Sequence, residues 1–187
     1  MPRYSHVIAV DDAPFEREHR GDVPIVGVAY SNLRIEGVLS SVIRRDGANA
    51  TKALARMIAG SQFATHTELI LLQGIALGGF NVVDIQGLSV ELGKAVLVIA
   101  RRAPDMKAIE SALRTRVPGG VRKWALIQKA GAMERCGSLF VQRAGIALDD
   151  ASAVIERLAI NGIVPEPLRV AHLIAGGVTT GRSRGRA

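Results

Sequence analysis

Short runs of apolar residues, separated by polar turns, predict a sheet whose strands are connected by helices. The most uniform run is Leu69 to Leu72, and an apolar run of this length indicates a strand that is buried on both faces. A glycine-rich turn follows, and glycine lets the backbone approach a ligand closely because it has no Cβ. Ligands of open α/β sheets bind at the carboxyl ends of the strands. We therefore expect a functional site at this strand end.

Three β-rich runs precede this strand, and the last two are joined by a short turn typical of a hairpin. The third run is apolar on both of its sides, which predicts cover on both faces of the sheet. The order of the segments predicts a mixed sheet with helices on both faces. We expect one domain over residues 1–176, followed by a basic flexible tail over residues 177–187. The predicted strands are 5–12, 24–31, 34–45, 69–72, 95–102 and 138–144, and the predicted helices are 49–60, 84–92, 104–116, 121–130, 149–160 and 168–175.

The composition is that of a globular domain, with 48% hydrophobic and 22% charged residues in a chain of 187. No apolar run is long enough to cross a membrane, and the N-terminus lacks the layout of a secretory signal. We therefore expect a cytoplasmic protein without membrane association. The single cysteine, Cys136, excludes an internal disulfide framework and a cysteine-based zinc cluster. We expect it to be a small buried side chain.

The formal net charge of +7 favours polyanions, and nucleic acid above all, as the partner. Individually, basic side chains are more often solvated surface residues, and the arginine-rich tail contributes to the surplus. Together they make DNA or RNA binding a reasonable expectation, and the oligomeric state is left open. The candidate phosphate contacts are Arg101, Arg102, Arg122, Lys123 and Arg169.

Four carboxylates lie where the predicted sheet could place them near one site. Asp11 and Asp12 end the first strand, and only one of them can face a given side because side chains alternate along a strand. Asp46 follows the third strand, and Asp84 opens a helix. Carboxylates at strand ends are frequent ligands of Mg²⁺ or Mn²⁺, which makes Asp11, Asp12 and Asp84 candidate metal ligands. The alternatives are a turn or cap for Asp11 and Asp12, an Asp-Gly turn for Asp46 and a helix start for Asp84.

Two further groups of residues are candidates for binding phosphate. His172 and Arg169 are three residues apart on the last predicted helix and share a face, although His172 also fits an interior histidine beside an Arg169–Glu166 pair. The glycine turn has neither the Lys-Ser/Thr of a Walker loop nor the spacing of a dinucleotide fingerprint. It still suggests a third hypothesis, an enzyme that holds the phosphate of a nucleotide-like small molecule. The residues of this turn are Gly74, Gly78, Gly79 and Asn81.

Several longer motifs in the chain resemble an uncharacterised archaeal protein family that is distantly related to endonuclease V. The resemblance covers nearly the whole chain and implies a ribonuclease H-like fold. Endonuclease V enzymes cut DNA or RNA near deaminated adenine with Mg²⁺ held by carboxylates at strand ends. The motifs are Val-Asp-Asp-Ala-Pro-Phe (10–15), Val-Gly-Val (26–28), Arg-Asp-Gly-Ala-Asn-Ala-Thr (45–51), Gly-Ile-Ala-Leu-Gly-Gly-Phe-Asn-Val-Val-Asp (74–84) and Pro-Glu-Pro-Leu-Arg-Val-Ala-His-Leu-Ile-Ala (165–175).

This resemblance implies that Asp11 is the first metal ligand and Asp46, by a looser match, the second, with His172 or Arg169 steadying the phosphate. The next acid of endonuclease V lies in an Asp-Gly pair at the end of the central strand, where this chain has Gln73 and a glycine. The tyrosine-bearing wedge of endonuclease V also has no counterpart here. Two hypotheses follow: a Mg²⁺-dependent endonuclease with a degenerate metal site, and a non-catalytic nucleic-acid or protein adaptor that has lost the site.

Overall fold

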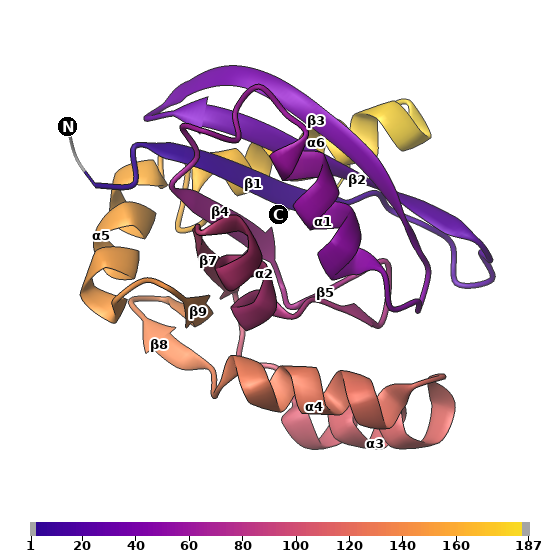
Figure 1. Cartoon of the computed structure of the whole chain (residues 1–187). Coiled ribbons are helices and arrows are strands. Elements are labelled where there is room, and N and C mark those ends of the chain that lie inside the picture. Colours follow the sequence, from indigo (N-terminus) through magenta and orange to yellow (C-terminus); the bar gives the residue numbers. More distant parts are fainter. Residues whose placement is uncertain (1–2, 185–187) are drawn as a thin grey trace.

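A seven-stranded mixed sheet organises the computed structural model, which describes residues 3–184 (Figure 1). The strands of this sheet are β1 (His6–Asp12), β2 (Asp22–Ser31), β3 (Arg34–Arg44), β4 (Leu69–Gln73), β7 (Ala95–Ala100), β8 (Glu134–Cys136) and β9 (Leu139–Ala144). Their order across the sheet is β3-β2-β1-β4-β7-β9-β8. β1, β4 and β7 are parallel, whereas β2, β3, β8 and β9 each run antiparallel to their neighbours. The carboxyl ends of three central strands therefore meet at one edge.

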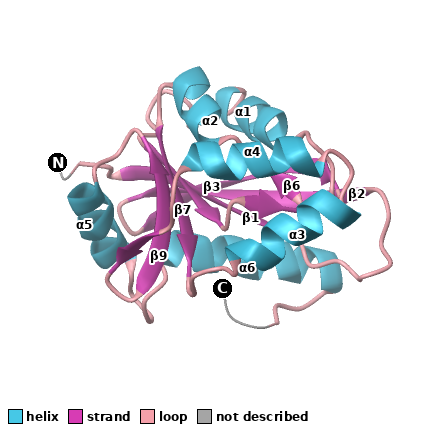
Figure 2. Ribbon diagram, turned by 90° about the horizontal axis from the view of Figure 1, so that it is seen from below, coloured by secondary structure: helices cyan, strands magenta, loops and turns pink. Residues whose placement is uncertain are grey.

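Helices cover both faces of the sheet, as Figure 2 shows. The helices are α1 (Ala50–Ala59), α2 (Ile85–Leu92), α3 (Met106–Arg116), α4 (Gly120–Ala130), α5 (Leu148–Leu158) and α6 (Glu166–Thr180), and a small hairpin is formed by β5 (Ala76–Leu77) and β6 (Asn81–Val82). The first two helices pack on one face, and α5 and α6 pack on the other. The α3–α4 hairpin forms its own small core with β6 beyond the strand ends.

The alternation of side chains along β1 decides which of its residues enter each core. Val7 and Ala9 of β1 belong to the cluster beneath α6, whereas Ile8 and Val10 belong to the cluster beneath α1. All four side chains are inaccessible or nearly so. By the same alternation, Asp11 projects toward the α6 face at the point where the strand leaves the core.

The predicted fold class is confirmed, and three details of the sequence-based prediction are wrong. The last helix runs to Thr180 rather than to about Ala175. After this helix, the Ser183 hydroxyl donates to the Leu173 carbonyl. The third strand is covered on one face only, and Val38 and Val42 on its other face are about half exposed. β8 and the β5–β6 hairpin were not predicted. Cys136 is buried, as expected. Within residues 3–184, no helix is both long and apolar enough to span a membrane.

Asn81 fixes the position of the segment that follows β4. Its side chain is completely buried, and its Oδ1 accepts a hydrogen bond from the Ala50 backbone N–H at 2.9 Å. Its Nδ2 donates to the Arg44 carbonyl and to Asn49 Oδ1, both at 2.8 Å. One side chain therefore connects the end of β3, the start of α1 and β6.

Replacing Asn81 should destabilise the fold although it removes no side chain of the hydrophobic core clusters. We expect Asn81→Ala to lower the free energy of unfolding by about 1–3 kcal/mol, because it leaves the buried Ala50 N–H without its acceptor. Chemical denaturation measures the change, and Asn161→Ala, at an exposed position, is the matched control. A loss below about 0.5 kcal/mol for Asn81→Ala would contradict the connecting role.

Candidate functional site

Asp11 ends β1 as a buried carboxylate at the middle of the sheet. It is 3% exposed, and its neighbours in register are Val26 of β2 and, one step beyond the Val10–Leu72 pair, Gln73 of β4. Burying a carboxylate among apolar strands is unfavourable unless it is paired or hydrogen-bonded. The partners of Asp11 are therefore the first thing to establish.

His172 of α6 supplies the main partner. Its Nδ1 lies 2.9 Å from Asp11 Oδ2, although the two residues are 161 positions apart in the sequence. Burial, followed by the nearby charge of Asp12, raises the pKa of Asp11 to about 7, and the contact with His172 only partly offsets this rise. The carboxyl group and the imidazole thus form a pair that can gain or lose a proton near neutral pH.

The C-terminal segment completes the surroundings of His172. The imidazole Nε2 lies 3.2 Å from the carbonyl oxygen of Arg184. A carbonyl oxygen can only accept, so Nε2 carries the hydrogen in this contact. Ser183 Oγ donates to the Leu173 carbonyl at 2.7 Å, which holds the segment against α6. Of the predicted tail, residues 185–187, which include Arg186, lie outside the described part of the chain.

Gln73 lies next to this pair with an unused polar atom. Val7 and Ala9 of β1 and Leu69 and Leu71 of β4 all face α6, so the alternation directs Gln73 to the same face as Asp11. Its Oε1 is buried and accepts no hydrogen bond from any described residue. An unpaired buried carbonyl oxygen is unfavourable by about 1–3 kcal/mol. A water or a cation bound there would remove that penalty.

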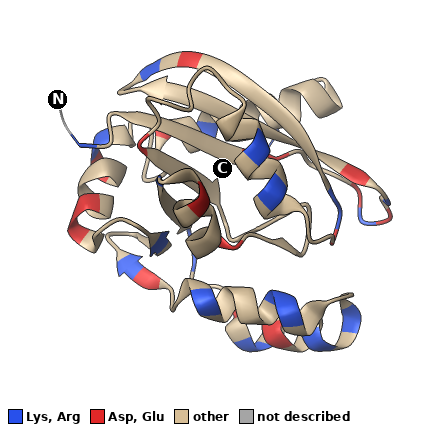
Figure 3. Ribbon diagram, in the orientation of Figure 1, with Lys and Arg blue, Asp and Glu red and all other residues tan. Residues whose placement is uncertain are grey.

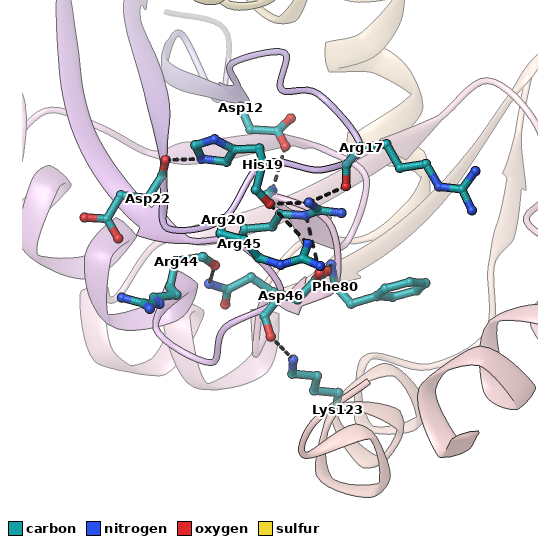
Figure 4. Close-up of polar contacts among 12 residues, drawn as sticks. Asp12, Arg17, His19, Arg20, Asp22, Arg44, Arg45, Asp46, Phe80 and Lys123 are labelled. Atoms are coloured by element: carbon teal, nitrogen blue, oxygen red, sulfur yellow. Dashed lines mark hydrogen bonds and ion pairs between the residues drawn. The ribbon is translucent and has the colours of Figure 1, made fainter. Parts of the chain in front are cut away.

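On the other face of the strand end, two carboxylates hold the glycine turn in place (Figure 4). Asp12 Oδ2 accepts from the Gly78 backbone N–H at 2.6 Å, and Asp46 Oδ1 accepts from the Phe80 N–H at 2.8 Å. Gly79 has a positive φ of 85°, and a Cβ there would collide with the Asp46 carboxylate. Asp12 at the end of β1 and Asp46 after β3 therefore both contact the glycine turn, whereas Asp11 faces away from it.

Two basic side chains reinforce this turn. Arg45 donates to the carbonyls of Arg17 and His19 and lies 3.4 Å from Asp46 Oδ2. Lys123 of α4 donates to the Asp46 carbonyl and is 4% exposed. Burial lowers the pKa of Lys123, against the opposing effect of the Asp46 charge. Lys123 is thus a structural donor, which contradicts its predicted role as a phosphate contact.

The comparisons with known proteins agree with this architecture. Residues 3–179 match the family model described as Endonuclease dU. The chain therefore belongs to the Endonuclease dU family. A UPF0215 protein of Deinococcus radiodurans is 53% identical over 185 residues, which are 99% of this chain and 94% of that one.

Solved structures of relatives and of more distant proteins share the fold. A protein of unknown function from Archaeoglobus fulgidus superposes with a TM-score of 0.86 at 34% identity, over 92% of this chain and 97% of that one. Bacillus subtilis endonuclease V gives a TM-score of 0.63 at 12% identity, over 95% and 81% of the two chains. Ciona intestinalis endonuclease V, solved with a DNA that contains inosine, gives 0.56 at 12%, over 89% and 82%. The predicted endonuclease V-like fold is confirmed.

In this Endonuclease dU family member, the predicted metal ligands do not form one cluster. Asp84 caps α2 through the Gly87 N–H and lies 2.7 Å from Lys129 Nζ. Burial opposes ionisation of Asp84, but these bonds hold its pKa below the ordinary value. Among residues 3–184, no group of three or more His, Cys, Asp or Glu side chains is placed to hold a metal ion. Asp84 is a helix cap here, and metal binding by Asp11 remains a prediction.

Basic residues gather on the α3–α4 hairpin, beside the glycine turn (Figure 3). The two helices contain one acidic residue, Glu110, and six basic ones, of which Lys123 alone is buried. Arg169, in contrast, is held by Glu166 through two hydrogen bonds of 2.7 and 2.6 Å, and this pairing lowers the pKa of Glu166. Among the predicted phosphate contacts, Arg101, Arg102 and Arg122 are exposed.

Sequence reasoning missed Arg45, which supports the turn, and the buried glutamine Gln142. Arg45 was not singled out because an arginine next to an Asp-Gly turn has no distinctive pattern. Gln142 of β9 is 2% exposed, which marks it as a buried polar side chain, but nothing local distinguishes it from a surface glutamine. In the structure, the adjacent side chains Val141 and Gln142 point to opposite faces of β9 and are both buried, so this strand is covered on two faces.

The raised pKa of Asp11 predicts a pH-dependent stability. The folded state binds a proton at Asp11 more tightly than the unfolded state, whose value is 3.8, so this group favours folding at low pH. The contribution is lost as the pH rises from about 4 to about 7. We expect Asp11→Asn to be more stable than the native chain by roughly 3 kcal/mol at pH 8 and nearly equal to it at pH 4.

Chemical denaturation at a series of pH values measures this difference. Glu18→Gln, which removes an exposed carboxylate, is the control and should leave the pH profile unchanged. A stability difference between Asp11→Asn and the native chain that stays constant from pH 4 to pH 8 would disprove the shift.

Proposed function

We propose that this protein is an endonuclease that hydrolyses a phosphodiester bond of DNA containing deoxyuridine, with the help of a divalent cation. The observation that carries the proposal is the buried Asp11–His172 pair beside the unpaired oxygen of Gln73. The name of the family supports deoxyuridine as the lesion. The endonuclease V-like fold supports phosphodiester hydrolysis at the carboxyl ends of the central strands.

The donor atoms present fit a hard cation such as Mg²⁺ or Mn²⁺. Asp11 offers a carboxylate and Gln73 Oε1 a neutral oxygen without a partner, both on the α6 face of adjacent strands. Mg²⁺ commonly takes one or two carboxylates and keeps several waters, so a single acid and an amide are sufficient for weak binding. A bound cation would lower the pKa of a water molecule and neutralise charge that develops on the phosphate.

The residues of the chain have separate tasks in this proposal. Asp11 must be ionised to bind a cation, and its pKa near 7 makes this dependent on pH. His172 orients the carboxylate through the 2.9 Å contact and can accept the proton that Asp11 releases. The fixed glycine turn keeps Asp12 and Asp46 away from this exchange, since both are engaged by backbone N–H groups.

The basic α3–α4 hairpin is a suitable surface for the nucleic-acid backbone. Its exposed charges adjoin the glycine turn through Lys123, which connects α4 to Asp46. The Ciona intestinalis endonuclease V that shares this fold was solved with DNA. Exposed cations at this position would attract phosphates in a manner that weakens with salt.

A non-catalytic adaptor is the second candidate, and Gln73 is the specific observation in its favour. A neutral side chain replaces an acid that the resemblance to endonuclease V places at this strand end. An adaptor would bind nucleic acid or protein equally well with Mg²⁺ and with EDTA, and it would cleave nothing. The two candidates therefore differ in a single assay.

Removing the carboxylate of Asp11 should abolish cleavage and keep the fold. We expect Asp11→Ala to lower the rate of cleavage of a deoxyuridine-containing oligonucleotide in Mg²⁺ by at least about 100-fold, because losing even a residue that orients a metal ligand costs about 10- to 100-fold. Glu18→Ala is the control for an exposed acid. Native protein that leaves the oligonucleotide intact in both Mg²⁺ and Mn²⁺ would favour the adaptor.

Restoring an acid at position 73 should strengthen cation binding. Gln73→Asp places a second carboxylate beside Asp11, so we expect a lower melting temperature without metal and a larger rise on addition of Mg²⁺ than in the native chain. Gln73→Asn, which is neutral and of the same size as aspartate, is the matched control. Equal Mg²⁺-induced shifts in the two variants would show that this strand end does not contact the cation.

A further inference from the structure

A small apolar cavity lies between the end of β7 and the α3–α4 hairpin. Its volume is about 210 Å³. Its walls include Val98 and Ala100 of β7, Met106 and Ile109 of α3 and Ile127 of α4. A cavity of roughly 150 Å³ holds one benzene molecule, so this one suits a single aromatic ring rather than a larger ligand.

Gln142 is the polar side chain in this lining, and its orientation is fixed. It lies opposite Val98 in the β7–β9 pairing and is 2% exposed. Its Nε2 donates to the Gly131 carbonyl at 2.7 Å. Turning the amide around would bring Oε1 against that carbonyl oxygen. The bond to Gly131 therefore leaves Oε1, and not Nε2, on the side of the cavity.

The oxygen of this amide is available to a ligand. Among the described residues, no group donates a hydrogen bond to Gln142 Oε1. The unpaired side-chain atoms that are fully enclosed belong to Arg45, Gln73 and Arg157, so Gln142 Oε1 is unpaired but still accessible. It is therefore open to the cavity that Gln142 lines. A half-satisfied buried amide is less favourable than an apolar residue of similar size. A hydrogen-bond donor entering the cavity would complete its bonding.

The cavity adjoins the candidate active site. Gly74, which follows Gln73 directly, is part of its wall. The cavity opens at the same edge of the sheet as Asp11 but on the opposite face, because Val98 belongs to the cluster beneath α1 and α2 whereas Asp11 faces α6. Gln142 of β9 is three strand spacings, roughly 14 Å, from β1. A nucleic-acid strand that crosses this edge would place one base in the cavity and a phosphate further along the strand beside Asp11.

We propose that Gln142 distinguishes a deaminated base from cytosine by accepting a hydrogen bond from the ring N–H of the deaminated base in this cavity. Deamination of cytosine replaces its 4-amino group by a carbonyl and converts ring N3 from an acceptor into an N–H donor. Uracil therefore donates to Gln142 Oε1, whereas the N3 of cytosine faces it with a lone pair. The inference rests on the proposed function, because it assigns a substrate-recognising residue to that site.

Binding of single-stranded oligonucleotides in EDTA tests the inference without cleavage and without base pairs to open. The oligonucleotides carry deoxyuridine, deoxycytidine or 2-pyrimidinone deoxyriboside at one position, and fluorescence anisotropy gives the dissociation constants. The 2-pyrimidinone ring has the size of uracil but lacks the N–H. We expect the native protein to prefer deoxyuridine over both by about 10- to 100-fold, the value of one buried hydrogen bond.

Gln142→Met removes the acceptor at nearly constant volume and should reduce this preference to within about threefold. Gln86→Met is the matched control, because Gln86 Nε2 also donates to a β9 carbonyl, that of Arg143, but the side chain lies outside the cavity lining. Thermal melting establishes that both variants fold. Should Gln142→Met fail to fold, the 2-pyrimidinone comparison in the native chain still decides.

The outcomes separate this inference from the proposed function. Selective binding that is lost in Gln142→Met, in a protein that cleaves nothing, would support base recognition and reject the endonuclease. Cleavage at deoxyuridine with a preference unchanged in Gln142→Met would keep the endonuclease and overturn the role of Gln142. Equal affinity of the native protein for deoxyuridine and 2-pyrimidinone would overturn it as well.

Discussion

The candidate site depends on the contact between Asp11 and His172. A carboxylate at the end of a central strand is stable in the fold only if a partner reaches it inside the apolar layer. The partner, His172, comes from the last helix, so α6 must cross β1 and β2. Apolar contacts among Val7, Val28 and Leu168 hold α6 in this position. The contact thereby joins the first and last elements of the chain and places a group with a pKa near 7 at the sheet edge.

The two faces of the same strand end have different roles because side chains alternate. Asp11 faces α6, and within residues 3–184 the Asp12 N–H is the one backbone group that donates to its side chain. Asp12 faces the other way and, with Asp46, is occupied in holding the glycine turn. Of these two adjacent acids, Asp11 can exchange a proton, whereas Asp12 has a structural role. Glycine is required at position 79 because the backbone there has a positive φ and because a side chain would displace Asp46.

Periodicity predicted most of the fold because strand and helix signals are local. It placed the strands that end at Asp12 and Gln73 and the cap at Asp84, where spacing alone carries the information. The site was less accessible, since its contacts join distant segments. Nothing around Lys123 indicates that its ammonium is used by a carbonyl 77 positions away. The pairing of Asp11 with His172 followed from no spacing, and the open oxygen of Gln142 depends on a bond to Gly131 that no motif records.

The neutral side chain at position 73 is consistent with the burial of Asp11. Burial, together with the adjacent charge of Asp12, already raises the pKa of Asp11 to about 7. An aspartate at position 73 would add a second charge on the same face, and two carboxylates that close cannot both be ionised without a cation. Gln73 supplies an oxygen without that charge, so no cation is needed there to neutralise a second carboxylate. In the proposed metal site, the consequence would be weaker attraction for a cation, and the release of a proton from Asp11 would control its binding.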